Sequence, residues 1–338
     1  MEGEGRQGMS GKKREAKWRP WDLLMRRSTR SLMRASRELE GHALFDRLHG
    51  YVYGAFPYLY IGIGTGEHPL ARAIGPVASW VLGRAQGASE ADGGDSGEAF
   101  ADGYHGKVVP LEQATQLVTV DEEIRLTDLE QIIPYSRARD IILKNPDHIV
   151  VLDCPCRSVR AEPCEPLDVC LIIGEPFASF VADHHPRRSR WIEPEEAVTI
   201  LREEDERGHV HHAFFKDAML DRFYAICNCC RCCCGAMQAH RTGVPMLAPS
   251  GYVSEVDPAL CEGCGACEDV CPFGAVSLSD GHARVNVDTC MGCGVCVSRC
   301  ERGAMTLRRE ARKGEPLDIR RLKERFEGKQ TGRAAEFG

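Results

Sequence analysis

Residues 261–272 read CEGCGACEDVCP, and residues 290–301 read CMGCGVCVSRCE. Both stretches carry the spacing C-x2-C-x2-C-x3-C, which brings four cysteines into a very short segment. Four glycines lie between the cysteines, at Gly263, Gly265, Gly292 and Gly294. Because glycine has no Cβ, it lets the backbone turn tightly enough for several thiolates to face one point. This pattern predicts two metal centres in one small module.

The repeat extends beyond the cysteines at a constant offset of 29 residues. The matched pairs are Val256 with Val285, Gly274 with Gly303, Ala275 with Ala304, and Leu278 with Leu307. Each half is expected to form a strand, a cysteine loop, a short helical turn and a second strand. We therefore predict a module with an internal pseudo-twofold repeat.

Residues 253–308 resemble the bacterial ferredoxins that carry two [4Fe–4S] clusters. In that family the fourth cysteine of each run ligates the other cluster. The resemblance therefore implies a first cluster on Cys261, Cys264, Cys267 and Cys300, and a second on Cys290, Cys293, Cys296 and Cys271. Glu301 replaces the proline found at Pro272 in the first run, a position that shapes the chain and is no ligand. A pair of zinc sites is the alternative, although zinc usually pairs two separate C-x2-C knuckles.

The composition limits the class of protein. A length of 338 residues predicts two or three domains, and the net charge of −7 is modest. The start of the chain has no apolar signal segment, and no run reaches the ~20 apolar residues of a membrane span. We therefore expect the 18 cysteines to act as thiolates in a reducing cytoplasm, such as that of an anaerobe. No phosphate-binding glycine loop or hydrolase motif is visible.

Composition shifts divide the chain into segments. Residues 1–37 carry eleven Lys or Arg against four Asp or Glu, which indicates a basic arm. Residues 86–103 are small, acidic and rich in glycine, so we expect a flexible insertion. The predicted segments are a basic, partly disordered arm (1–40), an apolar and aromatic segment (41–85), the insertion (86–106), a cysteine-rich α/β domain (107–250), the ferredoxin module (251–310) and a charged tail (311–338).

Ten further cysteines lie upstream of the module. They occur in a CPCR segment, on the loop after it, and in the segment CNCCRCCC, at Cys154, Cys156, Cys164, Cys170, Cys227, Cys229, Cys230, Cys232, Cys233 and Cys234. Three interpretations stay open: further iron–sulfur clusters, structural zinc, or dithiol–disulfide chemistry. This combination of segments with a terminal module resembles iron–sulfur oxidoreductase-type proteins of anaerobic microbes.

Periodicity predicts the elements that would carry these cysteines. Strands are expected at 148–153 and 169–173, a strand–turn–strand unit at 50–65, and helices at 136–145, 194–207 and 213–224. A capping box is expected at Thr127 and Glu130. Histidines that could ligate a metal or donate a proton are His184, His185, His209, His211 and His212.

Together these features predict an α+β protein in which a cysteine-rich α/β domain precedes a ferredoxin-like two-cluster module. The leading functional hypothesis is single-electron transfer through two [4Fe–4S] clusters, to or from a cysteine-rich metal site or a partner. The alternatives are a reductase with a catalytic cluster in the cysteine-rich domain, and a zinc-stabilised scaffold or regulator. We expect redox partner proteins and no nucleic acid, and we leave a peripheral membrane contact open.

Overall fold

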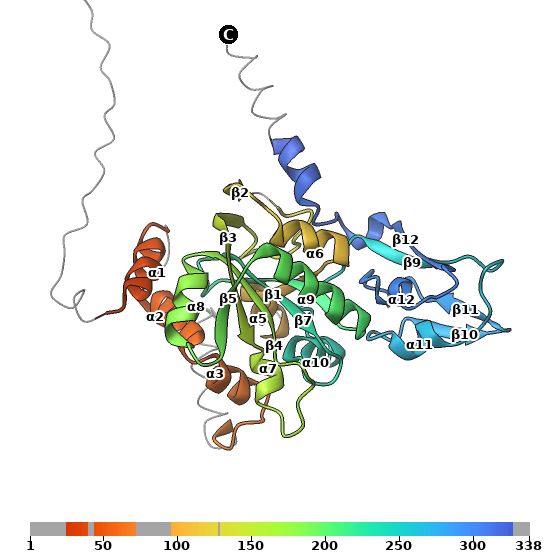
Figure 1. The fold of residues 1–338 in the computed structure, drawn as a ribbon, viewed down its shortest axis with the longest axis horizontal. Coiled ribbons are helices and arrows are strands. Elements are labelled where there is room, and N and C mark those ends of the chain that lie inside the picture. Colours follow the sequence, from red (N-terminus) through yellow and green to blue (C-terminus); the bar gives the residue numbers. More distant parts are fainter. Residues whose placement is uncertain (1–24, 40–43, 72–95, 128, 327–338) are drawn as a thin grey trace, which may run out of the picture.

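The computed structural model describes residues 25–39, 44–71, 96–127 and 129–326, and its two parts lie side by side (Figure 1). A central sheet with helices on both faces forms the larger part. Its strands are β1 (Tyr104–Val108), β2 (Ile124–Leu126), β3 (Ile141–Asp153), β4 (Asp168–Glu175), β5 (Ser189–Ile192), β6 (Val210–Lys216), β7 (Arg222–Cys229) and β8 (Leu247–Ala248).

The strand order is β2-β3-β4-β7-β6-β1-β8, and β5 also pairs with β3. All of these pairings are antiparallel except that of β1 with β8. The mixture of helices with a largely antiparallel sheet confirms the α+β class. The long strands in the middle are buried on both faces, which explains their nearly continuous apolar sequences.

Alternate residues of the central strands enter two separate cores. Val150 and Leu152 of β3 pack into the first core, whereas Ile149 and Val151 pack into the second. The first core is covered by α2 (Leu44–Ala55), α3 (Pro57–Gly64) and α8 (Phe177–His184), and the second by α6 (Leu111–Val118) and α9 (Pro194–Glu206) (Figure 1). The other helices here are α1 (Arg27–Arg37), α5 (Ser96–Gly103), α7 (Pro155–Ser158) and α10 (Gly235–Arg241).

The structure confirms three of the predicted elements. The strands expected at 148–153 and 169–173 lie within β3 and β4, and the helix expected at 194–207 is α9. The other predictions were wrong. Residues 50–65 lie in the helices α2 and α3, and residues 213–224 lie in β6, the turn after it and β7. Strand β3 begins at Ile141, inside the helix expected at 136–145.

Each error has a physical cause. The tyrosines of residues 50–65 point to β structure by propensity, but their helices are stabilised by packing on the first core, where Tyr53 is buried. In β6 every residue is buried, so the strand shows no polar alternation that would distinguish it from a helix. The capping box fails because residues 130–132 form a turn, and residue 128 lies outside the described residues.

The segment boundaries also need correction. Residues 96–106 are no flexible insertion, because they form α5 and part of β1 with Ala101 and His105 buried. Residues 86–95 lie outside the described residues. The basic arm contains α1, and its first 24 residues are not described. The charged tail returns to the larger domain, where Leu317, Ile319 and Leu322 enter the second core.

The smaller part holds the predicted module. Its elements are β9 (Tyr252–Val256), α11 (Ala266–Val270), β10 (Val276–Ser279), β11 (His282–Val285), α12 (Val295–Ser298), β12 (Met305–Arg309) and the 3₁₀ turn η2 (Ala311–Lys313). Strand β9 pairs with β12, and β10 pairs with β11, both antiparallel. Each half therefore contributes one strand to each ribbon.

The module packs directly against the larger domain. Met291, Cys293 and Val295 belong to the first core of the sheet domain. Arg299 donates a hydrogen bond to the carbonyl of Glu206 at 3.3 Å. Gly208, between α9 and β6, has a positive φ of 82°, and a Cβ there would lie 2.7 Å from Cγ2 of Val270 in the module. The two parts therefore share a packed interface.

No helix in the described part of the chain is long and apolar enough to cross a bilayer.

We predict that Gly208→Ala will lower the free energy of unfolding by about 2–4 kcal/mol, because it combines backbone strain of about 1–3 kcal/mol with a clash at the module interface. Gly243→Ala is the matched control, since Gly243 also has a positive φ (92°) but nothing lies within 4 Å of the added Cβ. Chemical denaturation of both variants separates the two effects. If both variants lose the same free energy of unfolding, the interface does not constrain Gly208.

Candidate metal centres

The cysteine loops of the module are built around glycines with left-handed backbone. Gly263 and Gly292 share a φ of 66°, and a Cβ on either would lie 2.2 Å from a carbonyl oxygen, of Gly281 and Tyr252 respectively. Gly265 and Gly294, with φ of 85° and 87°, begin α11 and α12. Because L side chains rarely adopt these angles, the two loops need glycine at equivalent places.

Backbone amides point at the cysteine sulfurs of these loops. The amide of Ala275 lies 3.2 Å from Sγ of Cys271, and that of Ala283 lies 3.4 Å from Sγ of Cys261. Cys290 receives the amide of Ser254 at 3.4 Å, and the hydroxyl of Ser254 lies 3.0 Å from Sγ of Cys296. Donors of this kind stabilise anionic sulfur, so this donor set fits thiolate-ligated iron–sulfur clusters.

The two sets of ligands implied by the ferredoxin resemblance differ in exposure. In the first set, Cys264 is exposed, Cys261 and Cys300 are partly exposed, and only Cys267 is buried. All members of the second set (Cys271, Cys290, Cys293 and Cys296) are buried. Burial raises the pKa of Cys293 well above its usual range, so metal binding there must displace a proton and is favoured by rising pH. The first set is therefore the more exposed of the two, and Cys293 of the second set packs into the first core of the sheet domain.

These loops match a known domain family. Residues 254–301 match the 4Fe-4S dicluster domain. A 53-residue segment is also 44% identical to one of the subunits of H(2):CoB-CoM heterodisulfide, ferredoxin reductase, in the forms from Methanothermobacter thermautotrophicus and from Methanothermobacter marburgensis. That match covers 14% of this chain and 8% of each relative. The module is therefore an iron–sulfur, ferredoxin-type electron-transfer module, and the similarity to these relatives is confined to a small part of their length.

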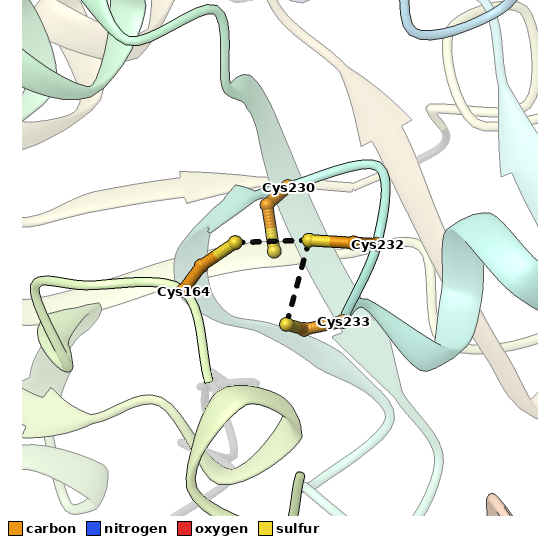
Figure 2. A group of neighbouring side chains, drawn as sticks. All are labelled: Cys164, Cys230, Cys232 and Cys233. Atoms are coloured by element: carbon orange, nitrogen blue, oxygen red, sulfur yellow. Dashed lines mark hydrogen bonds between the residues drawn. The ribbon is translucent and has the colours of Figure 1, made fainter. Parts of the chain in front are cut away.

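In the sheet domain, the structure divides the ten upstream cysteines into two groups. The first group, here called the tetrad, is shown in Figure 2 and consists of Cys164, Cys230, Cys232 and Cys233. Cys164 lies on the loop between α7 and β4, and the other three lie on the loop between β7 and α10. All four Sγ atoms lie within 4.8 Å of one another. The tetrad therefore converges on one point.

Hydrogen bonds to the backbone fix the loop that carries three of these cysteines. Arg160 donates to the carbonyl of Cys233 at 3.0 Å, and Gln238 donates to that of Cys232 at 3.0 Å. Arg241 donates to the carbonyl of Arg231 at 2.8 Å. Two of the three donors are arginines, so they also bring positive charge close to the thiols. These contacts fix the backbone of the loop that carries the three cysteines.

The sulfur spacing in the tetrad fits a single ion. Sγ of Cys232 lies 2.9 Å from that of Cys164 and 3.5 Å from that of Cys233. A tetrahedral ion with metal–sulfur bonds of about 2.3 Å holds its sulfurs roughly 3.8 Å apart. A [4Fe–4S] cluster places each thiolate on a different iron, so its thiolates stand farther from one another. Zinc or a single iron suits the tetrad better than a cluster does.

The remaining six cysteines, here called the hexad, lie beneath the tetrad in the first core. They line a cavity of about 80 Å³ together with apolar and aromatic side chains. The hexad consists of Cys154, Cys156, Cys170, Cys227, Cys229 and Cys234. Cys230 of the tetrad also lines this cavity, so the two groups are neighbours. The ten cysteines therefore fall into two neighbouring groups.

A buried ion pair supports the strand segment between Cys227 and Cys229. Nη2 of Arg157 lies 2.5 Å from a carboxylate oxygen of Glu204 and donates to the carbonyl of Asn228 at 3.0 Å. The Asn228 side chain donates to the carbonyl of Val169 at 2.7 Å. Burial alone would lower the pKa of Arg157. The charge and the hydrogen bond of Glu204 outweigh this effect and hold the pKa of Arg157 above its usual range.

The candidate histidines do not join the tetrad. His184 and His185 lie near the carbonyls of Phe180 and Gly54, each at 2.8 Å, and His211 lies 2.6 Å from Oδ1 of Asn228. His209 lies 2.7 Å from Glu204 and lines a groove beside the tetrad. These four histidines therefore have structural contacts within the sheet domain.

His212 differs from these four. It is fully buried opposite Cys227 across β6 and β7, and within the described residues neither of its ring nitrogens has a hydrogen-bond partner. Burial lowers the pKa of His212 to about 3, so the imidazole is neutral.

Sequence reasoning missed the aromatic wall of the hexad cavity. Tyr53, Tyr104 and Tyr224 line it, and they come from α2, β1 and β7. The hydroxyl of Tyr53 lies 2.7 Å from that of Tyr224 and 3.3 Å from that of Tyr104. Nζ of Lys216 lies 4.9 Å and 4.4 Å from the ring centroids of Tyr53 and Tyr104, and burial lowers its pKa to about 8. No local motif signals this convergence.

We predict different results for Cys264→Ala and Cys293→Ala. Each should remove about four irons, but Cys293→Ala should also destabilise the whole chain by about 2–4 kcal/mol, because Cys293 belongs to the shared core. Iron content, the visible absorption band and the unfolding midpoint test this expectation. Full iron in either variant would refute the ligand role of the altered cysteine.

Proposed function

We propose that this protein passes single electrons between a donor at the exposed end of the module and the cysteine-rich domain. The first cluster would be held by Cys261, Cys264, Cys267 and Cys300, and the second by Cys290, Cys293, Cys296 and Cys271. When bound, the clusters supply one-electron storage at low potential. The observation that carries the proposal is the difference in exposure between the two ligand sets.

The chain's own residues give the path a direction. Cys264 is open to solvent, so a redox partner can approach the first ligand set closely. Cys293 lies in the same core as hexad cysteines, so the second set touches the sheet domain through this residue. Glu262 and Arg302 lie beside the first set and form an ion pair at 3.0 Å, so charges of both signs border it.

The proposed cross-ligation rests on the pairing of the two halves. Under the repeat, β9 of the first half corresponds to β11 of the second, and β10 corresponds to β12. The β9–β12 pair therefore has a counterpart in the β10–β11 pair, and the structure contains both. The matched glycines also share their φ angles. These facts support a pseudo-twofold arrangement, in which Cys271 and Cys300 reach across to the opposite cluster. The two clusters would then lie close together, as rapid electron exchange requires.

At the tetrad we propose a single tetrahedral ion, either zinc or iron. A zinc ion would fasten the loop that separates the module from the hexad, whereas an iron ion would add a one-electron step. A groove beside the tetrad is lined both by Cys164 and Cys232 and by Asp269, Val270 and Pro272, which flank Cys271. The tetrad therefore lies beside the Cys271 loop of the module.

The proposal is tested on anaerobically purified protein by metal analysis and EPR during reductive titration. From the module we expect two low-potential reduction steps and a magnetic interaction between its reduced clusters, because the halves share ligands. Cys264→Ala should leave one module cluster, whose signal no longer shows that interaction. Absence of any reducible cluster in the wild-type protein would refute electron transfer by the module.

For the tetrad, we predict that Cys233→Ser will lower the content of zinc or iron by about one ion per chain without changing the module signals, because one tetrahedral site loses a ligand. Arg231→Ala is the matched control, since Arg231 lies in the same loop with an exposed side chain. Unchanged metal content in Cys233→Ser, with both clusters intact, would contradict the single-ion site and leave the module proposal standing.

A further inference from the structure

The hexad encloses a space instead of filling it. The cavity of about 80 Å³ is lined by all six hexad cysteines. One buried water requires only about 10–15 Å³ of such volume, so this space is large enough for a polyatomic group. Most protein interiors are packed as densely as organic crystals and contain few voids larger than a water molecule. Six thiols around a retained cavity therefore indicate a bound group.

The sulfurs approach the cavity from several elements. Cys170 of β4 lies opposite Cys227 of β7, and their Sγ atoms are 3.9 Å apart. Cys229 follows two residues along β7 and so faces the same side of the sheet. The other three come from helix starts, with Cys154 and Cys234 at the N-caps of α7 and α10 and Cys156 in the first turn of α7. Small buried cysteines in an ordinary core need no such convergence.

The spacing of the hexad distinguishes it from the tetrad. Among the residues that the structure describes, only the tetrad has three or more candidate ligand atoms within 4.8 Å of one another. The hexad therefore does not converge on a single ion. The cysteines of the 4Fe-4S dicluster domain likewise form no such group in the described part of the chain. A polynuclear cluster needs no convergence on one ion, because each thiolate binds a different iron.

We propose that the hexad cavity binds an additional polynuclear iron–sulfur cluster, separate from the two clusters of the module and from the ion at the tetrad. This inference rests on the proposed function only for the source of its electrons. Six sulfurs exceed the four that a [4Fe–4S] cluster uses, so two cysteines are available as extra ligands or as hydrogen-bond donors. Cys229 and Cys230 are adjacent, which joins the hexad to the tetrad through one peptide.

The tyrosine wall supplies a donor to this cluster. The hydroxyls of Tyr53, Tyr104 and Tyr224 can each donate one hydrogen bond. The two hydrogen bonds among them use two of these three donors. One O–H is therefore left to point at a guest in the cavity. Hydrogen bonds to cluster sulfur stabilise the reduced, more negative state and raise the reduction potential. Lys216 behind the rings adds positive charge on the same side.

The first test compares Cys170→Ser with Cys233→Ser and the wild-type protein by iron, zinc and sulfide analysis. We expect about twelve cluster irons in the wild type and about eight in Cys170→Ser, whose tetrad ion is retained. Cys233→Ser should show the converse, with all cluster iron retained. A wild-type protein with about eight cluster irons would overturn the additional cluster and leave the module proposal standing. A wild-type protein without the roughly eight irons of the module would instead contradict the proposed function.

The second test uses variants that keep every cysteine, in case Cys170→Ser does not fold. Tyr104→Phe should leave the iron content unchanged and make the potential of one cluster more negative, while the module clusters keep theirs. Tyr58→Phe is the matched control, because its hydroxyl donates to the carbonyl of Asp153 at 3.0 Å and it does not line the cavity. Identical EPR-monitored titrations for both variants and the wild type would refute the tyrosine contact, and with it a cluster in this cavity.

Discussion

The register between β4, β7 and β6 determines the chemistry of the sheet domain. Cys170, Cys227 and His212 stand opposite one another across these strands, and Cys229 faces the same side. Because side chains alternate along a strand, a slip of one residue would turn Cys227 and Cys229 to the opposite face. The buried contacts of Arg157 and Asn228 with neighbouring backbone hold this register in place. The positions of the thiols therefore depend on backbone pairing more than on any preference of cysteine itself.

Much of the module was predictable from sequence, because its ligands are close together in the chain. The spacing of cysteines and glycines specifies loops whose glycines adopt nearly equal φ angles in both halves. Strands β3 and β4 and helix α9 were also recognisable, since they have clear apolar runs or a helix start with proline. These features need only local information.

The division of the ten upstream cysteines was not predictable, because it depends on contacts between distant segments. Cys164 joins Cys232 although they are separated by 68 positions, and Cys229 and Cys230 are neighbours that belong to different groups. The same limitation hid the role of Tyr53 and Tyr104, whose side chains meet only after α2 packs on the sheet. Fully buried strands such as β6 also lose the polar alternation that would reveal them.

The chain enters the module after β8 and then returns to the sheet domain. Leu317 and Ile319 are buried in the second core, and the carbonyl of Glu315 accepts a hydrogen bond from Lys107 at 2.9 Å. The module is therefore tethered at both ends, unlike a carrier domain on a single flexible linker. Its distance from the cysteine-rich sites does not depend on diffusion. Transfer within the chain should then be independent of protein concentration, and only the step that loads the exposed end requires an encounter between molecules.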